Sequence, residues 1–151
     1  KSAAFSTFFD SPRELVFEAW TSAEHLAEWW GPDGFSLTTH SMDFSNGGIW
    51  SFTMHGPDGR DYKNRIQFIE IKPPASIVYK HAGEEETEHI KFQTRVAFTE
   101  VEGGTHVEVE MEFSSEEELA RVSRDYGAIE GAQQHLTHLG EFVKSMKEKR
   151  R

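Results

Sequence analysis

Apolar residues between Phe35 and Phe113 recur at every second position, which is the period of a β-strand with one buried face. The pattern is clearest near its end, where Val107, Val109 and Met111 alternate with histidine or glutamate. Short runs rich in Gly, Pro, Asn and Asp separate the stretches, and such turns join only antiparallel neighbours. The sequence therefore predicts a six-stranded antiparallel meander, preceded by a seventh strand over residues 3–10. The six stretches cover residues 35–44, 48–55, 60–71, 76–81, 88–99 and 105–113.

Two short helices are predicted between the first strand and the meander. Ser11 is the expected N-cap of the first helix, with Pro12 at the first helical position and Glu14 completing a capping box. The second helix repeats this arrangement with Thr21 and Glu24.

After Phe113 the period changes to three and four residues, which is typical of an amphipathic helix. Ser114 or Ser115 is the expected cap, and a continuous helix would be about 50 Å long at 1.5 Å per residue. Glycines at positions 127, 131 and 140 weaken it, so a bend near its middle is expected. The predicted apolar stripe consists of Leu119, Val122, Tyr126, Ile129, Gln133, Leu136, Leu139, Val143 and Met146.

This order of elements predicts one α+β domain over residues 1–151. An antiparallel sheet with one apolar face must cover that face, and the C-terminal helix is the element long enough to do so. A strongly twisted sheet curls around such a helix and contacts it along only part of its length. We therefore expect a hollow between the sheet and the helix.

Large aromatic side chains share the inward parity of the predicted strands, and polar side chains are mixed among them. A packed core is the alternative interpretation of the aromatic residues. A sealed core would avoid several buried polar groups, whereas a ligand cavity accommodates them. The predicted ligand-binding set is Trp50, Phe52, Met54, Tyr62, Asn64, Phe68, Tyr79, His81, Phe92, Thr94, Met111 and Phe113 from the sheet, with Tyr126, Ile129 and Gln133 from the helix.

Composition argues against several classes of function. The formal net charge of −10 is unsuited to nonspecific binding of nucleic acid or of an anionic membrane surface. No apolar run approaches the roughly 20 residues of a membrane helix. The sequence has no cysteine, which excludes disulfides, thiolate metal sites and cysteine nucleophiles. We expect a cytoplasmic protein that needs no cofactor.

The histidines raise the question of a metal site. His135 and His138 are three residues apart on the predicted helix, which allows shared ligation. Leu136 and Leu139 define the expected inward stripe, however, so both histidines are predicted to be solvated and no metal is expected. The histidines at outward strand positions, expected to lie on the surface, are His40, His55, His89 and His106.

Catalysis has little support in the sequence, since no nucleophile elbow or phosphate-binding glycine loop is present. His81 is the one weak catalytic candidate, because with Tyr62 or Asn64 it could form an acid–base pair. The favoured interpretation is a histidine satisfied by its neighbours. Trp29 and Trp30 are interpreted as a plug that fixes the helix pair to the sheet, with a pocket mouth as the alternative.

Three stretches carry a resemblance to a known family: "FDSPRELVFEAWTSAEHLAEWWGP" (9–32), "GGIWSFTMHGPDG" (47–59) and "FIEIKPPASIVY" (68–79). The chain resembles the START-like or SRPBCC superfamily, with the helix-grip fold of the birch-pollen allergen. Within it, the match is to domains named after activators of the 90-kDa heat-shock chaperone ATPase, from about Phe5 to Phe142. Many bacterial members carry a Gly-Trp pair midway along the last helix, where this chain has Gly131-Ala132.

The resemblance implies a fold more firmly than a function. Our leading hypothesis is non-catalytic binding of a small apolar or aromatic molecule between the sheet and the long helix. The family name suggests an alternative, a co-chaperone-like regulator of the heat-shock ATPase that meets its chaperone partner through the acidic surface. Relatives in the wider superfamily suggest a third, a cyclase or hydrolase acting in the same cavity. Homodimerisation is common among relatives, which allows a homodimer here.

Overall fold

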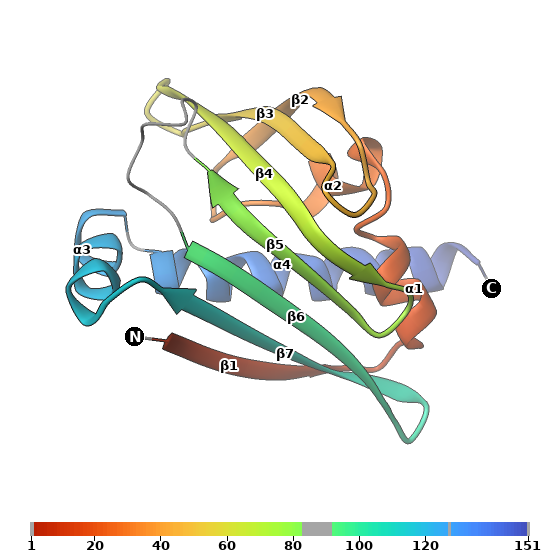
Figure 1. Ribbon diagram of the computed structural model, residues 1–151. Helices are drawn as coiled ribbons and strands as arrows, with labels where there is room; N and C mark the ends of the chain where they lie inside the picture. The colour runs from red at the N-terminus through yellow and green to blue at the C-terminus, as the bar shows by residue number, and fades with distance from the viewer. Residues whose placement is uncertain (1, 83–91, 127, 151) are drawn as a thin grey trace.

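A computed structural model describes residues 2–82, 92–126 and 128–150. Within these residues, seven strands form a single antiparallel sheet in the order β1–β7–β6–β5–β4–β3–β2 (Figure 1). The strands are β1 (Ser2–Phe9), β2 (Ser36–Met42), β3 (Ile49–His55), β4 (Asp61–Lys72), β5 (Ser76–Ala82), β6 (Phe92–Val101) and β7 (Gly104–Phe113). The sheet confirms the predicted meander and seventh strand, since β2 to β7 are neighbours in chain order and β1 pairs with β7.

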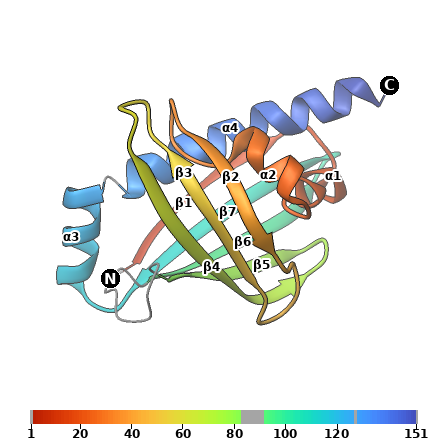
Figure 2. The same cartoon turned by 90° about the horizontal axis from the view of Figure 1, so that it is seen from above.

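Two register shifts interrupt the sheet. One lies between Thr39 and Ser41 where β2 pairs with β3, and the other lies between Phe68 and Glu70 where β4 pairs with β5. Such β-bulges bend a strand and increase its local twist. The sheet is accordingly curved, and it wraps around one side of the C-terminal helix (Figure 2).

The short helices are α1 (Arg13–Glu18) and α2 (Ala23–Trp29), and each begins one residue later than predicted. The N-cap of α1 is Pro12, without a side-chain hydrogen bond. The preceding Ser11 is buried, and its carbonyl accepts a hydrogen bond from the hydroxyl of Thr105 at 2.7 Å. The cap of α2 is Ser22, whose side chain accepts from the backbone N–H of His25. The hydroxyl of Thr21 instead donates to the carbonyl of Glu18.

The predicted single C-terminal helix is two helices, α3 (Glu116–Tyr126) and α4 (Ala128–Lys149). The predicted cap at Ser115 is confirmed, since its hydroxyl accepts from the backbone N–H of Glu118 at 3.0 Å. Figures 1 and 2 show α3 at the end of the molecule away from α1 and α2, with its axis turned from that of α4. Of these two helices, α4 is therefore the one that crosses the concave face of the sheet.

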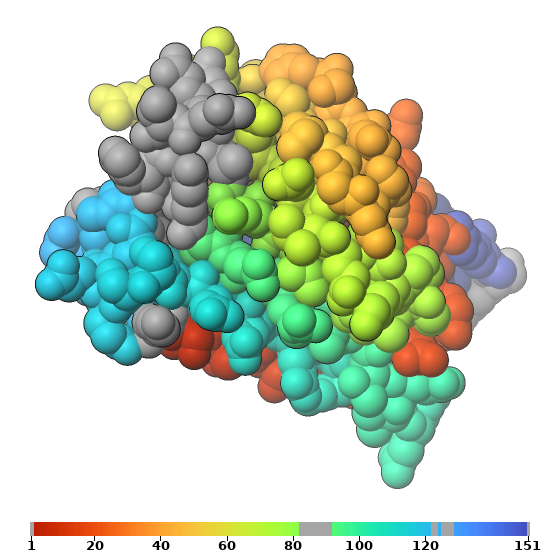
Figure 3. Space-filling view, viewed as in Figure 1, coloured from red at the N-terminus to blue at the C-terminus, as the bar shows by residue number. Residues whose placement is uncertain are grey.

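The core lies between α4, the short helices and the concave face. Leu139 and Val143 of α4 are fully buried, and Met146 is 6% exposed. Close approach of α4 to β1 depends on Gly140, because a Cβ there would lie 2.6 Å from Cε1 of Phe9. The convex face, shown in Figure 3, carries the alternating polar side chains of the strands.

Candidate functional site

A cluster of aromatic rings joins α2, the sheet and α4. We call it the inner cluster and define it as Trp20, Trp29, Trp30, Tyr79, His81 and His135. The ring of Trp30 lies 4.8 Å from that of Trp50 and 4.2 Å from that of His135, measured between centroids. Trp29 and Trp30 are almost completely buried, so they pack as the predicted plug. Trp29 also donates from Nε1 to the carbonyl of Ala19 at 3.0 Å.

His135 lies inside this cluster, so its predicted solvated position is wrong. Its ring centroid is 4.2 Å from that of Trp30 and 4.9 Å from that of Trp29. Its Nδ1 accepts the backbone N–H of Gly31 at 3.1 Å, which ties α4 to the loop after α2. Burial, together with the charges of His81 and His138, lowers the pKa of His135 from 6.5 to about 3, so the ring is neutral at pH 7.

His138 is also engaged rather than solvated. Its Nδ1 donates to the carbonyl of Gly31 at 2.8 Å, and its Nε2 lies 2.6 Å from a carboxylate oxygen of Asp33. The backbone N–H of Asp33 donates to the side chain of Gln134. With the bond between Gly31 and His135, four hydrogen bonds therefore fasten the loop after α2 to α4, and both histidines take part in them.

His81 enters the site from β5. Its ring stacks on Phe92 at 4.7 Å, and Phe92 stacks on Phe113 at 5.0 Å. Burial lowers the pKa of His81 from 6.5 to about 4. Its Nδ1 is buried and has no hydrogen-bond partner among the described residues, so the predicted satisfaction by neighbours is not found there.

Tyr79 lies between His81 and the tryptophans. Its ring is 5.9 Å from that of His81 and 5.8 Å from that of Trp20. Burial raises its pKa above the usual value despite a hydrogen bond with the buried Thr94. The indole Nε1 of Trp20 is a second buried polar atom without a partner among the described residues. Orphaned buried groups of this kind call for an explanation such as a bound molecule.

The structure divides the remaining predicted set into separate regions. Trp50 and Phe52 stack on each other at 3.9 Å beside Trp30, and Thr94 and Met111 pair across β6 and β7 next to the His81 stack. Phe68 instead packs on Phe44 at 4.9 Å, toward α1. Met54 is buried beside Gly31, and Asn64 is half-buried.

Two residues of the predicted set are exposed rather than enclosed by the sheet and α4. Gln133 is exposed on α4, because the inward face of the helix carries Ala132, His135 and Leu136 instead. Tyr62 has the inward parity but is 42% exposed, because it lies near the end of β4, where its ring packs beside Phe35 at 6.1 Å. Ile129 is half-buried. The side chains of Tyr126 and His89 lie outside the described part of the structure.

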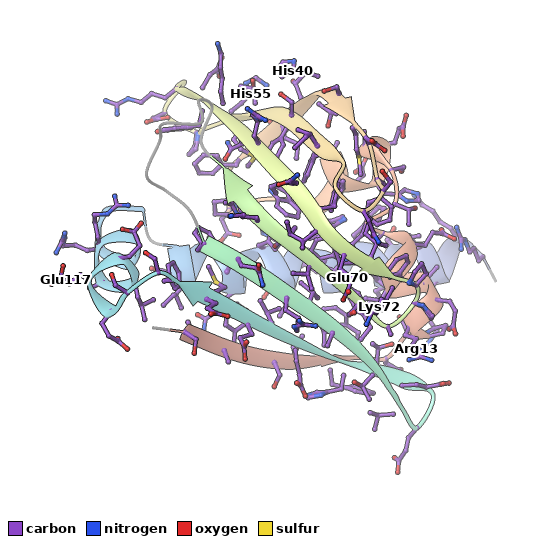
Figure 4. All side chains as sticks on the ribbon, in the orientation of Figure 1. Arg13, His40, His55, Glu70, Lys72 and Glu117 are labelled. Carbon is purple, nitrogen blue, oxygen red and sulfur yellow. The ribbon has the colours of Figure 1, made fainter. Side chains whose placement is uncertain are left out.

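The convex side of the sheet carries His40, His55 and His106, whereas His25 lies on α2 with its Nδ1 3.1 Å from the carbonyl oxygen of Glu18. Figure 4 shows His40 and His55 at the β2–β3 end of the sheet. His40 contacts the hydroxyl of Thr53 at 2.7 Å, and His55 lies 2.8 Å from a carboxylate oxygen of Asp61. His106 is partly exposed beside Glu108. Among the described residues, no three histidine or acidic side chains gather in a way that could hold a metal ion.

Two depressions on the surface of the described residues lie outside the predicted set. A groove of about 360 Å³ between α2 and α4 borders the inner cluster through Trp29 and Trp30, with Phe35, His138 and Phe142 among its other walls. A smaller depression of about 300 Å³ lies over β1, β6 and β7, where Arg95, Glu108 and Glu110 line it. Trp29 and Trp30 therefore line the surface groove between α2 and α4 as well as packing in the plug. None of the described helices is both long and apolar enough to cross a membrane.

A curved antiparallel sheet around a C-terminal helix, with two short helices after the first strand, defines a helix-grip domain of the START-like type. The chain belongs to the family described as "Activator of Hsp90 ATPase homolog 1-like protein", whose family profile matches residues 10–144. This membership confirms the resemblance seen in the sequence. Comparison with the curated proteins finds no match.

Solved structures of several bacterial proteins are similar to this chain. A protein from Arthrobacter aurescens is 23% identical with a TM-score of 0.87, over 95% of this chain and 86% of that one. A protein from Nitrosomonas europaea is 19% identical with a TM-score of 0.85, over 97% and 96%. A protein from Mycobacterium smegmatis is 24% identical with a TM-score of 0.82, over 96% and 92%. At these identities the similarity establishes the fold alone.

Neutral buried histidines make the stability of this fold pH-dependent. A histidine with a folded-state pKa below its unfolded value of 6.5 leaves more protons on the unfolded chain, so stability is lost as pH falls below 6.5. We expect urea unfolding to show a loss of up to about 2 kcal/mol per histidine between pH 6.5 and pH 5, at 1.36 kcal/mol per pKa unit. The pKa of Glu18 is lowered by Arg150, so the contribution of that carboxylate persists through this window.

The variant His81→Phe is expected to remove about half of this pH dependence, and His40→Phe is expected to leave it unchanged because His40 is exposed. An unaltered slope in His81→Phe would show that His81 is not held neutral by burial.

Proposed function

We propose that this protein binds a small apolar or aromatic molecule between the concave face of the sheet and the first half of α4. The observation that carries the proposal is a difference along α4. Toward its start Ala132, which packs on the core, and His135, which packs on Trp30, are only half-buried, whereas Leu139 and Val143 are sealed. Inward side chains that keep accessible surface indicate unfilled space beside them.

The chemistry of the neighbouring residues supports the same proposal. The rings of Trp30, Tyr79 and Phe92 offer flat apolar surfaces, and pockets for small molecules combine such walls with a few polar groups. The unpaired Nδ1 of His81 and Nε1 of Trp20 are such polar groups. A comparison with the family also supports the proposed binding. Many members have tryptophan at the position of Ala132, and the smaller alanine leaves the space that an indole ring would fill.

A thermal-shift series tests this function. Flavonoids, polyketides and fatty acids are added in turn, and at least one class is expected to raise Tm. A ligand present at a hundredfold its Kd stabilises the folded state by about 2.7 kcal/mol, which corresponds to roughly 5–10 °C for a domain of this size. The substitution Ala132→Trp is expected to abolish that shift by filling the space.

The matched control for Ala132→Trp is Gly131→Ala. A Cβ at Gly131 has only Cβ of Pro32 near it, at 3.9 Å, so this variant is expected to keep the ligand-induced shift. Alanine also favours a helix over glycine by up to about 1 kcal/mol. A shift that survives Ala132→Trp would place the ligand elsewhere, and the absence of any shift would contradict the proposal.

Regulation of a chaperone ATPase is the second candidate, and membership of a family described as homologous to an activator of the Hsp90 ATPase is the observation that favours it. The net charge of −10 suits contact with a basic surface of such a partner. An ATPase assay with the 90-kDa chaperone of the same cell separates the two candidates. Stimulation that persists in Ala132→Trp would establish an activity independent of the inner cluster, and no stimulation would remove this candidate.

A further inference from the structure

The hydrogen-bonding groups of the inner cluster define what kind of ligand they accept, and this inference rests on the proposed binding function. His135 provides the first group. Because its Nδ1 accepts the N–H of Gly31, the neutral ring carries its hydrogen on Nε2. No acceptor for this Nε2–H is found among the described residues, and the side chain is only half-buried. Nε2 is therefore a hydrogen-bond donor of fixed tautomer that is available to a ligand.

His81 provides the second group. Its ring is held in place by stacking on Phe92, and its neutral form carries one donor and one acceptor. Its ring lies 5.9 Å from that of Tyr79, and Tyr79 lies 5.9 Å from Trp30, the ring that contacts His135 at 4.2 Å. The buried Nδ1 of His81 has no hydrogen-bond partner within the described residues. The two imidazoles therefore offer a ligand one fixed donor and one group that can accept.

The charge of the surroundings sets a further condition. Among the described residues, the buried polar side chains are Ser11, Thr53, Thr94 and Thr105, and no lysine or arginine is among them. A carboxylate entering the cluster would lose its hydration without gaining a cation. Protonating a histidine to supply one is unfavourable at pH 7, since a pKa of about 4 leaves roughly one ring in a thousand charged.

We propose that the inner cluster selects a neutral aromatic ring that carries a hydroxyl group, in preference to an aromatic carboxylate or an unsubstituted ring. The hydroxyl accepts a hydrogen bond from Nε2 of His135 and donates one to the free ring nitrogen of His81. The ring lies against the aromatic walls formed by Trp30, Tyr79 and Phe92. A hydroxyl fits because it both accepts and donates, whereas a carboxylate at neutral pH only accepts.

Three probes of similar size test the selection: 2-naphthol, 2-naphthoate and naphthalene, each titrated at pH 7 with Kd measured by calorimetry or fluorescence. We expect 2-naphthol to bind at least about tenfold more tightly than either of the others, as one or two net hydrogen bonds imply. An equal or lower Kd for 2-naphthoate or for naphthalene would overturn the selection and leave the binding function standing. No binding of any of the three would overturn both.

The variant His81→Phe tests whether His81 is responsible for the preference for 2-naphthol. Phenylalanine keeps the stack on Phe92 and removes both ring nitrogens, so the preference for 2-naphthol over naphthalene is expected to fall below about threefold. His106→Phe, a substitution at a partly exposed position on the convex side, is the matched control and is expected to leave all three Kd values unchanged. An undiminished preference in a folded His81→Phe protein would overturn the role of His81. If the variant does not fold, the titration of the three probes against the unsubstituted protein still tests the proposal.

Discussion

Replacing Trp30 with alanine is expected to lower the free energy of unfolding by about 3–5 kcal/mol, the range measured for large aromatic residues in protein cores. The side chain is 8% exposed, and its ring is within 6.1 Å of five other aromatic side chains besides His135. Its removal leaves a cavity where α2, β3 and α4 meet. Because domains of this kind are stable by only about 5–15 kcal/mol, the loss is a large part of the total.

Urea unfolding followed by circular dichroism measures this effect without relying on tryptophan fluorescence. The control is Val101→Ala, since Val101 is 41% exposed in the β6–β7 hairpin and its truncation is expected to cost no more than about 0.5 kcal/mol. A cost below about 1 kcal/mol for Trp30→Ala would mean that Trp30 is not a structural plug. Its place at the groove between α2 and α4 would then be its main role.

The strands were predictable because period-two alternation and turn chemistry are local properties of the sequence. The alternation from Val107 to Phe113 matches the buried and exposed positions of β7 throughout. The division of the C-terminal helix into α3 and α4 was harder to predict from the sequence. Three glycines weaken the helix about equally by propensity, yet α4 continues through Gly131 and Gly140. At Gly140 tertiary packing requires glycine within the helix, because Phe9 occupies the space that a side chain would need.

The site was harder to predict because a helical stripe can be counted in more than one way. Steps of four from Ile129 lead to Gln133, whereas steps of three and four back from Leu139 lead to His135 and Ala132, which face the sheet. A histidine is an unusual member of such an apolar stripe, because its ring nitrogens need partners. The partner here is the backbone N–H of Gly31, a contact between residues 104 positions apart that local patterns do not reveal.

The alternation of side chains along a strand is also a limited guide to burial, as Tyr62 and Phe68 illustrate. Alternation tells which face of a strand a side chain occupies, but not where along the strand the covering helix ends. Tyr62 and Phe68 share one face of β4, yet one is 42% exposed and the other is buried toward α1. Positions along the strand follow from the path of α4 and the short helices, which only the assembled fold provides.

The Gly47-Gly48 pair before β3 yields the second large expected effect. The backbone N–H of Gly47 donates to the carbonyl of Phe68 at 2.6 Å, and the carbonyl of Gly48 accepts from the N–H of Phe68 at 2.9 Å. These bonds set where β3 begins on β4. They therefore position Trp50 and Phe52 against the inner cluster.

The two glycines are required for different reasons, so they form a matched pair of variants. Gly47 has φ +84°, and a Cβ there would have no atom within 4 Å among the described residues. Gly47→Ala is therefore expected to cost only the left-handed backbone penalty of about 1–2 kcal/mol. At Gly48 a Cβ would lie 2.0 Å from the carbonyl oxygen of Asp43. Gly48→Ala must therefore displace backbone, at a cost of about 3 kcal/mol or more. Urea unfolding of the two variants measures the difference, and an equal or larger cost at Gly47 would show that backbone conformation, rather than close approach to Asp43, makes this pair necessary.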